Sequence, residues 1–175
     1  TYTKQRWLPS FSFISEYHQH PAYIEAIANS ILEHWKSNTK SELLLFSFHG
    51  IPQRYISNGD PYAQHCETSS RLIAEALGLK ANEWQLVYQS RFGREPWLQP
   101  YCDKTLQTLP DKGIKSVDVI CPGFSVDCLE TLEEIDQENR AYFLDSGGTN
   151  FNYIPCLNDS DVHAKLICEL IEANR

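Results

Sequence analysis

A short apolar run at residues 43–48, LLLFSF, constrains the fold of this 175-residue chain more than any other feature. Its nearly continuous hydrophobicity is typical of a parallel strand that helices cover on both faces. His49 and Gly50 follow the run, and turn-forming residues mark 52–61 as a loop before the next helix. Open α/β sheets usually place ligand chemistry at the carboxyl ends of their strands, which favours a functional role for His49. Position alone leaves an equal alternative, a loop histidine that is hydrogen-bonded to neighbouring backbone.

Helices and strands are predicted to alternate along the rest of the chain. The spacing of apolar residues predicts helices over 21–37, 62–77, 97–109 and 127–144, and a last helix that buries residues between 162 and 171. Further strands are predicted over 83–89, 116–120 and 153–156. Strands that alternate with helices predict one α/β domain over residues 1–175, with three layers (α/β/α) and a parallel sheet of about four strands.

Charge and cysteine usage exclude several classes of protein. The chain has 15 Lys and Arg against 23 Asp and Glu, a net charge of −8, which argues against a nucleic-acid partner. Its six cysteines are scattered without a C-x-x-C pair, which disfavours a zinc ribbon or an iron–sulfur cluster and indicates reduced thiols. No apolar run approaches the roughly 20 residues of a membrane span, so we expect a cytoplasmic protein. A peripheral membrane contact is compatible with the sequence, but no strongly basic amphipathic segment requires it.

The beginning of the chain suggests that it is part of a larger protein. It opens with Thr1 and contains no methionine, so we expect a piece of a longer chain or a processed form. Aromatic residues at positions 2, 7, 11 and 13 are spaced like a strand or an arm that packs on another surface. Part of that surface is expected to belong to a portion that this chain lacks.

The predicted helix over 127–144 carries an acidic stripe. At about 100° per residue, four acids fall within an arc of roughly 80° and four apolar residues lie on the other side. The acids are Asp127, Glu130, Glu134 and Glu138, and the apolar residues are Leu129, Leu132, Ile135 and Phe143. Periodicity alone favours a solvated amphipathic helix whose first acids complement the helix dipole.

Topology changes that balance. Glu130 follows the strand at 116–120 and His49 follows the strand at 43–48, so a parallel sheet brings both to the same carboxyl edge. A histidine that faces carboxylates can bind a divalent metal or exchange protons near neutral pH. The sequence leaves open which of the two residues binds metal and which takes a proton. The chain has no G-x-G-x-x-G, G-x-x-x-x-G-K or G-x-S-x-G motif, which argues against those nucleotide-binding loops and against an α/β-hydrolase.

Other polar and aromatic residues favour structural roles. His18 and His20 could bind a metal as a pair, but capping and packing at the start of the helix at 21–37 is the favoured interpretation. Arg91 and Arg94 could meet an anionic ligand, but solvation is favoured. Tyr88 and Trp97 could shape a ligand pocket, although a core role is the default for each.

Several ordered motifs resemble the carboxyl-terminal half of the ferrochelatase family. They are SEYHQHPAYIEAIANSI, SFHGIP, NGDPY, YQSRFG, PWLQP and FSVDCLETLEEID, and together they cover nearly the whole chain. The cysteine at position 128 makes the last motif look bacterial, because animal members usually have histidine there. The family inserts ferrous iron into protoporphyrin IX to make protohaem, the last step of haem biosynthesis.

The resemblance implies a chelatase-like, Rossmann-type fold of two similar domains, of which this chain supplies the second. His49 matches the active-site histidine, Glu130 the active-site glutamate, and Glu134 and Asp127 the nearby acidic path, so all four are candidate metal or proton ligands. The amino-terminal domain, which provides much of the porphyrin-binding lip, is not in this sequence, so we expect the isolated chain to be a weak catalyst. Some members carry a [2Fe–2S] cluster on cysteines in a C-terminal extension. Here only Cys168 lies in the predicted last helix, so we expect no cluster and no other tightly bound cofactor.

Two alternatives remain at this stage. A related chelatase that inserts cobalt or nickel into another tetrapyrrole would use a similar pair of histidine and glutamate. A domain that binds tetrapyrrole or metal without turnover is the alternative from a different class.

Overall fold

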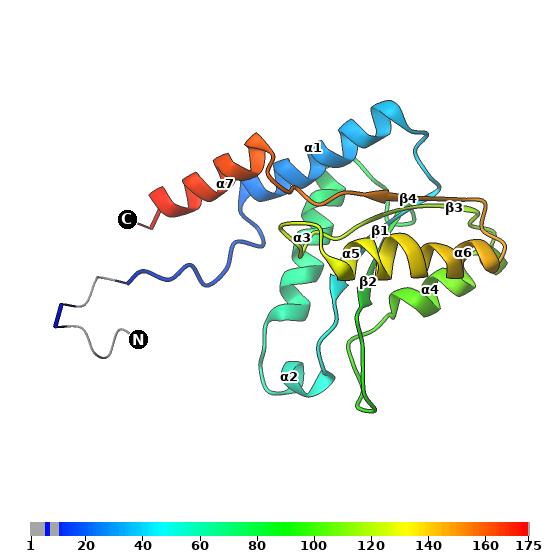
Figure 1. The fold of residues 1–175 in the computed structure, drawn as a ribbon, viewed down its shortest axis with the longest axis horizontal. Helices are drawn as coiled ribbons and strands as arrows, with labels where there is room; N and C mark the ends of the chain where they lie inside the picture. The colour runs from blue at the N-terminus through cyan, green and yellow to red at the C-terminus, as the bar shows by residue number, and fades with distance from the viewer. Residues whose placement is uncertain (1–5, 8–10, 175) are drawn as a thin grey trace.

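A parallel sheet forms the centre of the computed structural model, which describes residues 6–7 and 11–174 (Figure 1). Within these residues the strands are β1 (Leu43–His49), β2 (Trp84–Gln89), β3 (Ser116–Ile120) and β4 (Asn150–Ile154). They are ordered β2-β1-β3-β4 and every neighbouring pair is parallel. The predicted parallel sheet of about four strands is therefore confirmed.

Helices cover both faces of the sheet. The helices α1 (Pro21–Ser37), α3 (Tyr62–Ala76) and α7 (Asp161–Glu172) pack together on one face. On the other face lie α4 (Cys102–Thr108), η3 (Glu134–Asn139) and α6 (Arg140–Asp145). Figure 1 shows α1 and α7 on the opposite side of β3 and β4 from α5 and α6. The three layers are those of the predicted α/β/α fold.

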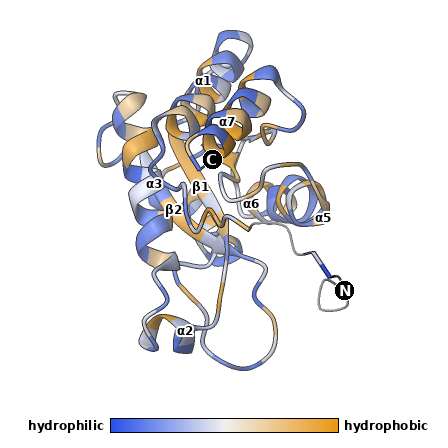
Figure 2. Ribbon diagram, turned by 90° about the vertical axis from the view of Figure 1, so that its left-hand side faces the viewer, coloured by the Kyte–Doolittle hydropathy of each residue, from blue (hydrophilic) through white to orange (hydrophobic). Residues whose placement is uncertain are grey.

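The apolar run at 43–48 explains why β1 is central. Side chains that alternate along β1 enter two separate cores: Leu44, Phe46 and Phe48 join one, and Leu43 and Leu45 join the other. Figure 2 shows the hydrophobic colour along β1, in the interior between the helical layers. Full burial of each large apolar side chain contributes about 1.5–3 kcal/mol to the stability of the fold, so replacing one with a polar residue would be destabilising.

The shorter elements fill the connections. A five-residue helix, α2 (Gln53–Ser57), interrupts the predicted loop after β1, and η2 (Pro110–Lys112) follows α4. The strand predicted over 153–156 begins earlier and spans Asn150–Ile154.

The helix predicted over 97–109 is wrong in its first turn, because α4 begins at Cys102. Pro100 has no N–H to donate, and a proline disfavours helical geometry in the residue before it. Residues 97–101 instead pair as irregular backbone with the ends of β1 and β2. The N–H of Leu98 donates to the carbonyl of Ile51 at 3.0 Å, and the N–H of Tyr88 to that of Pro100 at 2.9 Å.

The helix predicted over 127–144 is also different. It begins at Leu129 as the four-residue helix α5 (Leu129–Leu132) and continues through η3, which is a π-helix, into α6. Leu129 and Leu132, which we expected on the buried side, are 73% and 45% exposed, whereas Ile135 and Phe143 are buried as expected. The wider π turn rotates the second half of this segment relative to the first, so one α-helical projection does not describe both halves.

The segment before α1 runs away from the sheet (Figure 1). Its side chains Trp7, Phe11 and Phe13 are exposed, so the surface on which the expected arm packs stays a prediction, and Tyr2 lies outside the described residues. None of the helices in the described part of the chain is both long and apolar enough to cross a membrane.

Candidate functional site at the carboxyl edge of the sheet

His49 ends β1 and lies beside Gln89, its partner at the end of β2. Its Nδ1 is 2.6 Å from the carbonyl oxygen of Gly50, which can only accept, so Nδ1 is the donor. Nε2 is then the ring nitrogen that can bind a ligand or exchange a proton. Trp97 and Phe124 flank the half-buried ring, each with its ring centroid 6.4 Å away.

Gly50 allows the strand end to approach its neighbour closely. Its N–H donates to the carbonyl of Gln89 at 2.8 Å. A Cβ at this position would lie 2.9 Å from the same oxygen and 3.2 Å from the Trp97 ring. Any other residue would therefore push the chain away and shift the adjacent His49.

Glu130 lies on α5, which follows β3. Cys128 and Thr131 close a capping box at the start of α5, in which the Cys128 N–H donates to the Thr131 hydroxyl at 2.9 Å. Hydrogen bonding to the Cys128 thiol is the main cause that lowers the pKa of Glu130, with smaller contributions from its own backbone N–H and from His49. Glu130 is thus an exposed carboxylate within the electrostatic reach of His49.

Gln89 connects β2 to the acidic helix. It is 3% exposed, and its Nε2 donates to the carbonyl of Glu130 at 2.6 Å and to Glu134 at 3.4 Å. Its Oε1 accepts from the hydroxyl of Ser47 at 2.8 Å and from the thiol of Cys121 at 3.4 Å. One buried amide therefore links β1, β2 and the residue after β3 to the backbone that carries Glu130.

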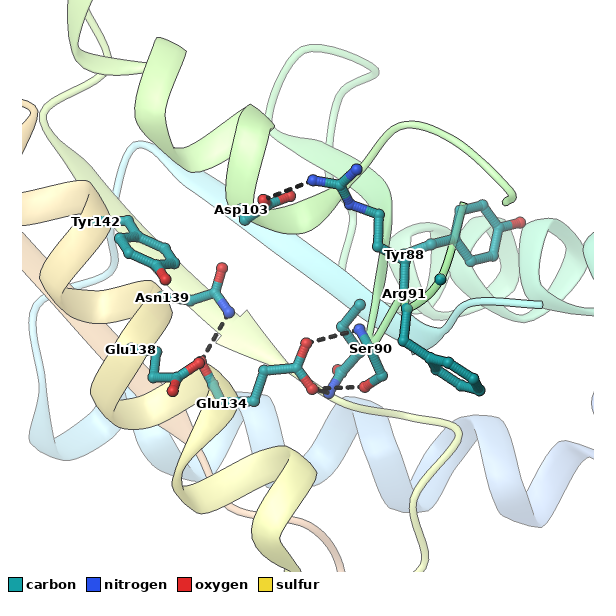
Figure 3. A pocket seen from close by; sticks show the side chains of 11 residues that line it. Tyr88, Ser90, Arg91, Asp103, Glu134, Glu138, Asn139 and Tyr142 are labelled. Carbon is teal, nitrogen blue, oxygen red and sulfur yellow. Dashed lines mark hydrogen bonds and ion pairs between the residues drawn. The ribbon is translucent and has the colours of Figure 1, made fainter. Parts of the chain in front are cut away.

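Glu134 turns inward toward the end of β2 (Figure 3). One carboxylate oxygen accepts from the N–H of Ser90 at 2.6 Å, and the other accepts from the Ser90 hydroxyl at 2.5 Å. Ser90 has a positive φ of 64°, which turns its N–H and hydroxyl to the same partner. Glu134 and Glu138 line a cavity of about 370 Å³ there, whereas His49, Asp127 and Glu130 do not line it.

Asp127 does not belong to the acidic stripe, contrary to the helical projection. It precedes α5 and turns toward β4 and the loop that follows, where it accepts from Tyr153 Oη at 2.5 Å and Asn158 Nδ2 at 2.7 Å. Burial alone would raise the pKa of Asp127, but these bonds and one from the Cys156 N–H outweigh it and lower the pKa. The carboxylate holds the turn into α5 in place.

Three nearby residues, Arg91, Tyr88 and Trp97, make contacts within the domain. Arg91 is exposed and pairs with Asp103 at 3.2 Å, while its guanidinium stacks over Tyr101. Tyr88 and Trp97 are both buried, as their default core role predicts, and Tyr88 also lines the cavity of about 370 Å³.

Gln89 and Ser90 are the site residues that the sequence analysis missed. Both lie in YQSRFG at the end of a predicted strand. A glutamine and a serine at a carboxyl edge, next to His49 in the sheet order, were the available signal.

A histidine and a carboxylate at the carboxyl edge of an open parallel sheet are the arrangement expected of an α/β domain with a ligand site at its strand ends. The comparison with known families makes this specific. The chain belongs to the ferrochelatase family, because the family model described as Ferrochelatase matches residues 1–175.

Bacterial relatives named Ferrochelatase support this assignment. The protein from Marinobacter nauticus is 55% identical over 173 residues, which is 99% of this chain and 47% of that relative. The protein from Hydrogenovibrio crunogenus is 57% identical over 166 residues (95% of this chain, 44% of the relative), and that from Vibrio parahaemolyticus is 55% identical over 166 residues (95% and 52%). This chain therefore spans about half the length of the curated relatives it matches.

Proposed function

We propose that the protein containing this chain inserts ferrous iron into protoporphyrin IX to form protohaem, in the cytoplasm. This chain is its carboxyl-terminal half, and an amino-terminal half completes the cleft. The observation that carries the proposal is the free Nε2 of His49 at the edge where Glu130 presents its carboxylate. The membership of the family, and the half-length match to each relative, support it.

Metal insertion needs a base and an anionic metal ligand on one wall of the cleft. Two pyrrole protons must leave the macrocycle as the divalent ion enters it. We assign proton removal to His49, because its Nε2 has a lone pair and imidazole exchanges protons near neutral pH. Glu130 meets the metal, because its lowered pKa keeps it anionic over a wide pH range.

Glu134 belongs to the path by which the ion approaches. It lies one helical turn beyond Glu130 and lines the cavity that also contains Glu138. Its carboxylate is held by Ser90, so it attracts a cation from a fixed position. Asp127 acts indirectly in this proposal, because it does not line this cavity and instead binds Tyr153 and Asn158 at the turn into α5.

The exposed apolar residues of α5 fit a cleft that another domain completes. Leu129 and Leu132 flank Glu130 and are open to solvent in this chain. An apolar face beside the reacting groups suits a flat macrocycle, because burial of its rings supplies binding energy without a fixed polar partner.

Insertion assays on the full-length protein test the proposal. His49→Ala and Glu130→Gln are each expected to reduce turnover of protoporphyrin and ferrous iron by at least about 100-fold, because each removes a group that acts at the reacting atoms. The double variant should be little worse than either single one, since both damage the same step. Glu138→Gln is the matched control on the same stripe and should cost far less.

Three results would contradict the proposed function in different ways. Equal, small losses for Glu130→Gln and Glu138→Gln would remove Glu130 from the mechanism. Preference for cobalt or nickel with another tetrapyrrole would indicate a related chelatase. Tight binding of tetrapyrrole without turnover would indicate a binding protein.

A further inference from the structure

Three potential metal ligands lie together on the α1 and α3 side of the sheet. Glu16 and His18 come from the segment before α1, and His65 comes from the first turn of α3. His65 Nε2 is 3.0 Å from Glu16 Oε2, and His18 Nδ1 is 3.9 Å from the same oxygen. One ligand atom from each residue falls within 4.8 Å of the other two.

The cluster is anchored to the body of the domain. The Ser69 hydroxyl on α3 donates to the carbonyl of His18 at 2.7 Å, which fixes the backbone between the two segment ligands and α1. The Tyr17 ring packs edge-on against Tyr23, at 5.7 Å between centroids. The ligands are therefore brought together by tertiary contacts over a separation of about fifty residues, not by chance neighbours in sequence.

One buried nitrogen in the cluster lacks a hydrogen bond in the described part of the chain. His18 Nδ1 is buried and makes no hydrogen bond within the described residues, and its distance of 3.9 Å from Glu16 is too long for one. Burial of an unpaired polar atom costs free energy, which a bound ion would offset. The three residues also line a cavity of about 200 Å³, whose wall includes Tyr62 and Cys66.

The donor set selects the kind of ion. Two imidazoles and one carboxylate suit a divalent transition metal, whereas Ca²⁺ and Mg²⁺ prefer oxygen ligands throughout. With metal–ligand bonds of about 2.0–2.2 Å, ligand atoms around a tetrahedral ion lie roughly 3.3–3.6 Å apart, so the wider separations in the cluster, 3.9 Å and up to 4.8 Å, must shorten when an ion binds. The two rings are stacked, with centroids 3.7 Å apart and planes 9° apart, and must tilt until both planes meet at the ion. Histidine permits this because its χ2 torsion is broad.

We infer that Glu16, His18 and His65 form a second site for a divalent transition metal, with a fourth position open to solvent. The ligands of this site are distinct from those of the proposed iron insertion, because neither His49 nor Glu130 lines its cavity, although Phe48 and Gly123 extend the cavity to the carboxyl edge of the sheet. It replaces the pair of His18 and His20 considered from the sequence: His20 takes the N-cap position of α1 and makes no side-chain cap.

Titration with Co²⁺ alone tests the site in the full-length protein. Visible absorption of bound Co²⁺ reports its ligands directly and does not depend on enzyme activity. The background carries His49→Ala and Glu130→Gln, so that the proposed insertion site does not contribute. In this background one equivalent of Co²⁺ should bind, and His65→Gln or Glu16→Gln should weaken that binding at least tenfold.

His20→Ala is the matched control, because it removes an imidazole two residues from His18 without removing a ligand. It should leave Co²⁺ affinity and the absorption spectrum unchanged. His65 is half-buried at a cavity wall and does not belong to either apolar core, so its substitution should preserve the fold even if His18→Ala does not, and circular dichroism checks this. Absence of bound Co²⁺ in the background protein would overturn the inference, as would equal binding with and without His65. Failure of iron insertion in the wild-type protein would instead count against the proposed function alone.

Discussion

Gln89→Leu should destabilise the fold and disturb the site together. Leucine fits the buried space but offers no polar atom, so the Ser47 hydroxyl loses its acceptor and the Glu130 carbonyl loses its donor. Ser47 is fully buried, and an unsatisfied buried group costs about 1–3 kcal/mol. Glu130 is exposed, so its carbonyl can turn to water, and the unpaired Ser47 hydroxyl sets the expected loss at about 1–3 kcal/mol in the free energy of unfolding.

Urea unfolding of the full-length protein, followed by tryptophan fluorescence, measures this loss as a lower midpoint at an unchanged slope. Gln85→Leu is the matched control on the same strand. Gln85 is half-buried and makes no side-chain hydrogen bond within the part of the chain that the structure describes, so its change should stay within about 0.5 kcal/mol. If both variants have the same midpoint, the amide of Gln89 does not hold the site together.

Gln89→Glu tests the donor side of the Gln89 amide separately from its acceptor side. It keeps an acceptor for Ser47 but places a carboxylate next to the Glu130 carbonyl and the Glu134 carboxylate. The new acid should be destabilising at pH 7 by at least as much as leucine. Part of the loss should be recovered at low pH, where the protonated acid again donates to the Glu130 carbonyl. A loss that does not depend on pH would show that the donor side of Gln89 is unimportant.

Three further outcomes are expected. The isolated 175 residues should fold but insert iron poorly, because a half-cleft neither excludes water nor orients a flat macrocycle; robust insertion would show that the substrate site is misplaced. The purified protein should show no iron–sulfur chromophore, because its cysteines lack cluster spacing; stoichiometric sulfide with a cluster spectrum would contradict this. Asp127→Asn should lower the free energy of unfolding at pH 7. Because the pKa of Asp127 is lowered in the folded state, its carboxylate stabilises the fold fully above its ordinary pKa of about 3.9. This contribution disappears as the pH falls through the pKa of the folded state. The difference in unfolding midpoint between Asp127→Asn and wild type should therefore narrow in acid.

The sheet could be predicted because its strands bury both faces. The run at 43–48 has apolar residues in both alternating positions, and no surface element carries that pattern. From strand order alone, His49 and Glu130 could be placed at one edge, because parallel strands all end at the same side. Helix α1 could be predicted equally well, since Ile24, Ile27 and Ile31 recur at helical spacing and are all buried.

The role of Gln89 could not be predicted in the same way. A glutamine gains its importance from partners that are 32 to 42 residues distant in sequence, at Ser47, Cys121 and Glu130. Local patterns contain no information on such contacts, and a polar residue near a strand end is solvated in most proteins. The predicted start of α4 was wrong for a simpler reason. The apolar spacing was given more weight than the effect of Pro100, which disfavours helical geometry in the residue before it.

The π-helix explains both the misread stripe and the alignment of the acids. Thr131, Ile135, Asn139 and Phe143 are buried at a constant spacing of four, which is wider than the 3.6 residues of an α-helical turn. An α-helix would rotate this row off the sheet, whereas the bond from the Glu138 N–H to the Glu133 carbonyl, at 2.9 Å, widens the turn and keeps the row in place. Two of its members are polar, so hydrophobicity did not reveal it. The acids Glu130, Glu134 and Glu138 come directly before Thr131, Ile135 and Asn139, so they have the same spacing of four. The widened turn that keeps the core row buried therefore also keeps the acids on one line.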